Sequence, residues 1–192
     1  MAKSFTDDEK INIRENLLKA CELSWSKYGY KKTNISDLCT SAGISKGAFY
    51  MFFQSKEELF CDTLLMVQNK LYQLIEDTLE KSPTKDGVAQ ALKLIYREYD
   101  KSIFLYDSNN VDFIAFTNKL SKEQMNQLKS NSLKGASISI FRPYLQLKIE
   151  EDKAKAIIGT LLSTISNKEN VHYGHFQVFD FLVDQVIGEI FE

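Results

Sequence analysis

Side chains that bind anions gather in one stretch of this chain. Hydroxyl groups, ammonium groups and the free N–H groups at helix N-termini are the groups with which proteins hold phosphate. The stretch from Lys27 to Lys56 holds five lysines and one acidic residue, although the whole chain carries a net charge of −2. Positive charge is therefore concentrated on one surface, which predicts contact with a polyanion. The candidate side chains are Thr33, Ser45, Lys46, Tyr50 and Lys56.

The same stretch has the spacing of two short helices joined by a sharp turn. Apolar residues recur at helical spacing after Thr33, which we expect to cap the first of these helices. Gly43 is expected to form the turn in the left-handed conformation. Ser45 is expected to cap a second helix, from Lys46 to about Phe52. Two short helices around a glycine turn predict a helix-turn-helix over about residues 33–53, whose second helix is shaped to enter a DNA major groove.

Helical patterns cover the rest of the chain, which contains only two prolines. A capping box at Thr6-x-x-Glu9 opens a first helix, and Ser55-x-x-Glu58 opens a long one. Ser82-Pro83 is expected to start another. The expected helices cover residues 7–28, 55–79, 82–105, a short segment to 120, a segment opened by Ser121, 150–166 and 176–191. The sequence predicts an all-α protein with a three-helix DNA-binding head (7–54), joined by a long helix to a helical body (55–192).

Composition and motifs exclude several other classes. The 192 residues contain no apolar run of membrane-span length and no signal peptide, and three unpaired cysteines indicate a reducing cytoplasm. No phosphate loop or nucleophile motif is present, so an enzyme is not expected. His172-x-x-His175 lacks further ligands, and neither a metal nor a cofactor is expected. Redox sensing through Cys61 or another thiol stays open as an alternative.

Residues 13–66 resemble the DNA-binding domain of the TetR family of bacterial transcriptional regulators. The resemblance rests on Leu17-Leu18-x-Ala20, Gly29-Tyr30-x-x-Thr33, Ile35-x-Asp37-Leu38, Ala42-Gly43-Ile44-Ser45-Lys46-Gly47, Tyr50-x-Phe52-Phe53 and Lys56-Glu57-Glu58-Leu59-Phe60. It implies DNA contacts at Thr33, Ser45, Lys46, Gly47, Ala48, Tyr50, Met51 and Lys56.

The chain departs from the family pattern at Ala48, Met51 and Phe52, where Thr, His and Tyr are common. These replacements remove hydrogen-bonding groups from the recognition surface. Base readout is then expected to depend on Lys46, on apolar contact with thymine methyl groups and on DNA shape.

The resemblance also implies two roles for the body, each with core packing as its alternative. Aromatic side chains would line a pocket for a hydrophobic or planar ligand. They are Tyr96, Tyr99, Phe104, Phe113, Phe116, Phe141 and Tyr144. The last two helices would form a four-helix homodimer interface. Their candidate residues are Ile158, Leu161, Leu162, Ile165, Phe179, Leu182, Val183 and Val186.

The resulting hypothesis is a cytoplasmic, homodimeric repressor that a small, hydrophobic or aromatic molecule releases from a double-stranded DNA operator. The alternative is a DNA-binding or adaptor protein of the same fold without an inducer. Neither hypothesis involves a membrane.

Overall fold

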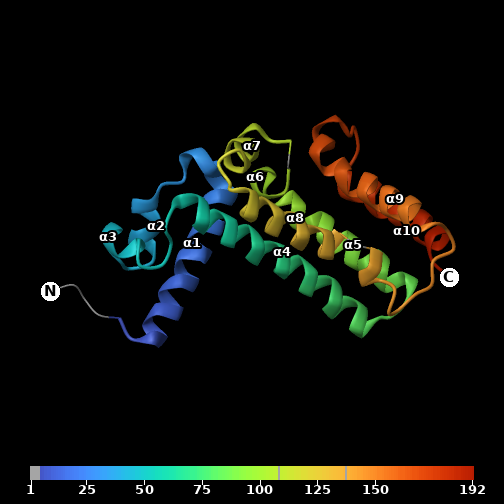
Figure 1. Ribbon diagram of the computed structural model, residues 1–192. Helices are drawn as coiled ribbons and strands as arrows, with labels where there is room; N and C mark the ends of the chain where they lie inside the picture. Colours follow the sequence, from blue (N-terminus) through green and yellow to red (C-terminus); the bar gives the residue numbers. More distant parts are fainter. Residues whose placement is uncertain (1–4, 108, 137) are drawn as a thin grey trace. The chain divides into compact units, whose positions relative to one another are not determined.

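The computed structural model describes residues 5–107, 109–136 and 138–192 (Figure 1). Its α-helices are α1 (Asp7–Lys32), α2 (Ile35–Ser41), α3 (Lys46–Phe49), α4 (Lys56–Lys81), α5 (Lys85–Asp100), α6 (Ile103–Tyr106), α7 (Val111–Thr117), α8 (Lys122–Ala136), α9 (Glu151–Ser163) and α10 (His175–Ile190). Two 3₁₀ segments, η1 (Ile138–Ile140) and η2 (Thr164–Asn170), flank α9 in the chain. The prediction of an all-α fold is confirmed.

The chain divides into two compact units. The first comprises the chain up to Val67 together with Phe104–Leu128, and the second comprises Gln68–Ile103 and Lys129–Glu192. The first unit thus holds the helix-turn-helix and also α7, which lies in the second of the two domains expected from the sequence. Helix α4 contributes its first part to one unit and its remainder to the other.

Aromatic side chains fill the core of the first unit. Trp25 of α1 is fully buried, with its ring centroid 4.6 Å from that of Phe60 and 5.0 Å from that of Phe116. Phe49 and Phe53 stack on each other beneath the recognition segment. Since buried aromatics carry the largest apolar surface per residue, these contacts hold α1, α4 and α7 to the helix-turn-helix.

The second unit has a separate core around α5, α9 and α10. Tyr96 of α5 stacks on Phe179 of α10, with ring centroids 3.7 Å apart and planes inclined by 9°. Arg97 of α5 donates to both carboxylate oxygens of Asp180 on α10, the shorter bond being 2.7 Å. An antiparallel bridge between Leu147 and Phe191 closes the chain end against this core.

Most predicted helix starts agree with the structure. The Thr6–Glu9 capping box is complete, and Ser45 and Ser55 each accept a hydrogen bond from the backbone N–H three residues later. Gly43 has φ +71°, as expected for its turn.

Several helix boundaries expected from the sequence are wrong. Thr84, rather than Ser82, caps α5, because its hydroxyl accepts from the N–H of Gly87. The α-helical part of the recognition segment ends at Phe49, and turns carry the chain on to Phe52. The helix expected to reach residue 105 ends at Asp100 and is followed by α6, and the helix expected to reach 166 ends at Ser163 and continues as η2.

Gly29 interrupts α1 one residue after the predicted helix end. Its φ of +80° and ψ of 172° lie outside the helical region, and the helix resumes at Tyr30. The renewed turn leaves backbone N–H groups without helical partners. Asp112 of α7 accepts hydrogen bonds from the N–H groups of Tyr30 and Lys31, the latter at 3.0 Å. The buried Asp112 carboxylate therefore caps the turn that leads into the helix-turn-helix.

Replacing Gly29 with alanine should destabilise the first unit by about 1–3 kcal/mol. Alanine would have to adopt a positive φ, and its Cβ would lie 2.6 Å from the Asp112 Oδ2 atom, which is held by hydrogen bonding. Urea denaturation measures the effect. Gly47→Ala is the matched control, because a Cβ added to Gly47 of α3 would meet no atom closer than 3.9 Å. Equal midpoints for the two variants would show that the Gly29 geometry is unimportant.

Candidate nucleic-acid interface

The recognition segment presents a continuous exposed surface above a buried anchor. Phe49 is fully buried, whereas Lys46 and Gly47 are exposed. Tyr50 is 55% exposed and Met51 is 60% exposed. Tyr50 and Met51 thus offer apolar surface next in sequence to the recognition helix that holds Lys46, as a DNA-contact surface would.

Four lysines of this unit are free to meet phosphates. Lys27, Lys31, Lys32 and Lys46 have no carboxylate oxygen within 4.0 Å in the described part of the chain. Lys10 and Lys19, by contrast, pair with acidic residues of α1. The positive surface predicted from the sequence is thus formed by side chains that no internal ion pair neutralises.

The structure corrects the predicted role of Thr33. Asn34 is the N-cap of α2, since its side-chain oxygen accepts from the N–H of Asp37 at 3.0 Å. Thr33 is 1% exposed, and its hydroxyl donates to the carbonyl of Gly29 at 2.9 Å. Its hydroxyl therefore stabilises the end of α1 instead of facing a phosphate.

Lys56 is also held inside the first unit. Its Nζ atom donates to the carbonyl oxygen of Tyr30 at 2.6 Å and lies 4.3 Å from the centroid of the Tyr30 ring. Burial lowers the pKa of the Lys56 ammonium group, only partly offset by the charge of Glu57. The hydrogen bond satisfies a carbonyl at the end of α1, where a cation is also favoured by the helix dipole. A phosphate would have to compete with this contact.

Tyr30 joins the same cluster through its hydroxyl, which donates to the Glu57 carboxylate. Burial, followed by this hydrogen bond, raises the pKa of Tyr30 well above its usual value. Burial alone would raise the pKa of Glu57, but the bond from Tyr30 and the charges of Lys119 and Lys56 lower it overall. Tyr30 thus donates as a neutral phenol to an ionised carboxylate.

Sequence reasoning missed Asn34, the exposed residue that caps α2. The signal that could have found it is the cap itself, because asparagine is preferred over threonine at that position.

The seven aromatic candidates for a ligand pocket divide between the two cores. Phe104, Phe113 and Phe116 pack in the first unit, where Phe113 stacks near Trp25 at 6.2 Å. The other four belong to the second unit. Phe116, Tyr96 and Phe141 are at most 4% exposed, which agrees with the core-packing alternative for these three. The candidates in the second unit are Tyr96, Tyr99, Phe141 and Tyr144.

The dimer candidates show a similar division. Five of them are buried against the chain's own core, namely Ile158, Leu161, Ile165, Phe179 and Val183. Leu162, Leu182 and Val186 are half-buried. For the five buried residues, the face that the sequence assigned to a partner is the one that covers the chain's own core.

Buried thiols give no support to redox sensing. Cys21, Cys39 and Cys61 are all free and at most 2% exposed. Burial raises the pKa of Cys21 to about 12 and that of Cys61 to about 11. Because the thiolate is the reactive form, these groups are inert near neutral pH.

The histidine pair and the helices give two further observations. His175 lies 3.3 Å from an oxygen of Asp100, while His172 is exposed. In the described ranges no three ligating side chains come together in a way that could hold a metal ion. None of the helices described is both long enough and apolar enough to cross a membrane.

A helix-turn-helix with an exposed recognition segment and unpaired lysines defines a DNA-binding protein. Residues 17–62 match the family model of the bacterial regulatory proteins of the tetR family. Residues 17–62 thus carry a DNA-binding domain similar to that of the TetR family of transcriptional regulators. Members of this family are transcription factors, in agreement with the expectation that the chain is not an enzyme.

Individual relatives agree with this assignment. The chain is 31% identical over 83 residues to the regulator YhgD of Bacillus subtilis, and the match covers 43% of this chain and 44% of YhgD. It therefore spans less than half the length of that relative. It is 27% identical to the transcriptional repressor KstR2 of Mycolicibacterium smegmatis, over 75% of both chains.

The fold matches solved structures over nearly its whole length. The regulator FadR from Bacillus subtilis, solved in complex with stearoyl-CoA, superposes with a TM-score of 0.63 at 14% identity. The match covers 92% of this chain and 98% of FadR.

Replacing Lys46 and Lys56 with alanine should have different effects. Lys46→Ala should make the negative slope of log K against log salt for DNA binding shallower by about 0.9, because one phosphate contact is lost. Stability should be unchanged, since the exposed ammonium group has no internal partner in the described residues. Lys56→Ala should cost about 1–2 kcal/mol of stability, since the Tyr30 carbonyl loses a charged donor. Salt-dependent fluorescence anisotropy and urea denaturation measure the two quantities. An unchanged urea midpoint and a shallower salt slope for Lys56→Ala would instead make Lys56 a phosphate ligand.

Proposed function

We propose that this chain is a cytoplasmic, homodimeric repressor that binds a two-fold symmetric operator through two copies of the helix-turn-helix. The observation that carries the proposal is the exposed surface of Lys46, Gly47, Tyr50 and Met51, with Ala48 half-exposed among them. Ser45 contributes through its cap of α3, which orients Lys46 in the first helical turn. The relative KstR2 is named a transcriptional repressor, which supports repression rather than activation for this chain.

The proposed effector is a small hydrophobic or aromatic molecule that binds in the helical body. The FadR structure with stearoyl-CoA supports this class of ligand for a protein of the same fold. Among the predicted aromatics of the second unit, Tyr99 and Tyr144 are the best candidates for ligand contact, because they are packed against the core without being enclosed by it. The ligand would weaken the free energy of DNA binding by as much as it binds the DNA-incompetent conformation more tightly than the DNA-binding one. This difference is typically about 1–3 kcal/mol.

The dimer in this proposal uses the outer faces of α9 and α10. The first turns of α9 expose the charged residues Asp152, Lys153 and Lys155, whereas its later exposed residues are small. Phe181 of α10 is 63% exposed. No atom lies within 4 Å of a Cβ placed on Gly159 or Gly188, so both glycines open onto free space. Small residues allow helices to approach closely, and an exposed phenylalanine offers apolar area to bury. The small residues of α9 are Ala156, Gly159, Thr160 and Ser163.

Binding of the purified chain to DNA upstream of its own gene tests the proposal. Saturable binding with two chains per site, much tighter than to random duplex, is expected. Binding no tighter than to random DNA would overturn local autoregulation and favour the adaptor alternative. A thermal-shift screen of hydrophobic and aromatic compounds then separates an inducible repressor from a regulator without an inducer, because a ligand of the folded state raises the melting temperature.

Replacing Gly159 with leucine should convert the dimer into a folded monomer. A Cβ at this position meets no atom within 4 Å, and the leucine side chain would occupy the space that a partner helix needs. Light scattering should show the mass fall from twice 22.1 kDa to 22.1 kDa, and operator binding should weaken more than tenfold because one half-site is lost. Gln90→Leu, at an exposed position of α5, is the size-matched control. A monomeric unmodified chain, or a dimeric Gly159→Leu variant, would overturn this interface.

A further inference from the structure

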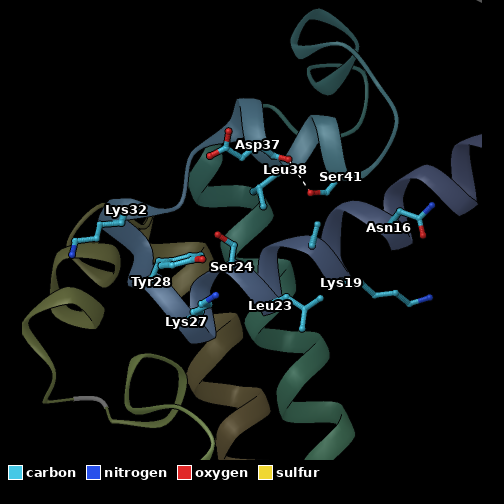
Figure 2. Close-up of a pocket in the computed structure, with 11 residues that line it drawn as sticks. Asn16, Lys19, Leu23, Ser24, Lys27, Tyr28, Lys32, Asp37, Leu38 and Ser41 are labelled. Atoms are coloured by element: carbon cyan, nitrogen blue, oxygen red, sulfur yellow. Dashed lines mark hydrogen bonds between the residues drawn. The ribbon is translucent and has the colours of Figure 1, made fainter.

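A hollow of about 800 Å³ lies between α1 and α2, on the first unit (Figure 2). Its volume falls in the range of about 300–1,000 Å³ typical of small-molecule sites. In Figure 2, Leu23, Ser24 and Tyr28 line the hollow from α1, and Leu38 and Ser41 line it from α2. It is separate from the recognition segment, since no residue of α3 contributes to it.

The lining combines apolar surface with an exposed ring. Leu23 is 72% exposed and Tyr28 is 48% exposed, so both offer area that a ligand could cover. Ala20 and the buried Leu38 complete the apolar part. A flat hydrocarbon group lying here would lose contact with water on the side that faces α1 and α2.

The charged part of the lining is positive. Lys19, Lys27 and Lys32 contribute three ammonium groups, and Asp37 contributes the one carboxylate. Asp37 already accepts a hydrogen bond from the side chain of Asn34. The ammonium group of Lys27 lies 4.9 Å from the centroid of the Tyr28 ring, and Lys32 has no carboxylate within 4.0 Å in the described part of the chain. Lys27 thus stands beside an exposed aromatic ring, and Lys32 lines the same hollow, each without an acidic partner in the described residues.

We propose that this hollow binds a flat aromatic carboxylate. Its ring system would lie against Leu23 and Tyr28, and its carboxylate would accept hydrogen bonds from Lys27 and Lys32. A nucleic-acid phosphate would match the lysines but leave Leu23 uncovered, and a neutral hydrocarbon would match Leu23 but not the lysines. An amphipathic anion satisfies both parts of the lining. The proposal concerns the head alone and does not require the repressor function.

Calorimetric titration of the whole chain with sodium 2-naphthoate and sodium 4-phenylbenzoate tests the proposal. One molecule should bind per chain, and neutral 2-naphthamide should bind at least about tenfold more weakly because it cannot pair with the ammonium groups. Saturable binding of neither carboxylate up to millimolar concentration would overturn the site. Equal binding of naphthoate and naphthamide would also overturn it.

Variants locate the bound molecule. Lys27→Gln and Lys32→Gln should each weaken naphthoate binding about three- to tenfold, and Leu23→Asp should abolish it. All three positions are exposed, so the variants should fold normally. Lys31→Gln is the matched control, because Lys31 is exposed beside Lys32 but does not line the hollow. Naphthoate binding that survives all three changes would place the ligand elsewhere and refute the assignment.

Discussion

The geometry of the DNA-binding unit depends on one buried carboxylate. Asp112 accepts hydrogen bonds from two successive backbone N–H groups, at Tyr30 and Lys31, directly after the positive-φ residue Gly29. A glycine is needed there for both its backbone angles and its lack of a Cβ, since any side chain would meet Asp112 or Phe104. The turn that follows leads within a few residues to Asn34, the cap of α2. The entry of the chain into the helix-turn-helix is thus set by a residue of α7.

Tyr30 extends this constraint to α4. Its N–H is bound by Asp112, its carbonyl by Lys56 and its hydroxyl by Glu57, so one residue connects three helices by hydrogen bonds. Residues 104–128 belong to the first unit, whereas the chain on either side of them belongs to the second. The two units are therefore joined covalently at 103–104, at 128–129 and within α4.

Local signals made most of the fold predictable, and long-range contacts made the rest unpredictable. The capping residues Thr6, Ser45 and Ser55 and the turn at Gly43 each act within four residues, so they can be read directly. The role of Lys56 depends on its partner Tyr30, which is distant in the sequence, and no spacing rule reveals that its ammonium group is already satisfied. The Thr33 hydroxyl binds the nearby carbonyl of Gly29, but that contact depends on the break of α1 at Gly29, next to which Asp112 of α7 binds the backbone. Phe113 and Phe116 were likewise predictable as apolar, but their packing against Trp25 required the tertiary structure.

The distinction between satisfied and free polar groups also orders the surface by function. Lys56 stabilises the head because its ammonium group is committed to a carbonyl, while Lys46 is available to DNA because nothing in the described chain holds it. Lys27 and Lys32 are also without an acidic partner among the described residues, and they line the same hollow as the exposed Leu23 and Tyr28. The exposed large side chains that follow Lys46 in the chain are instead Tyr50 and Met51. The neighbours of each lysine, in addition to its charge, therefore determine which anionic partner it suits.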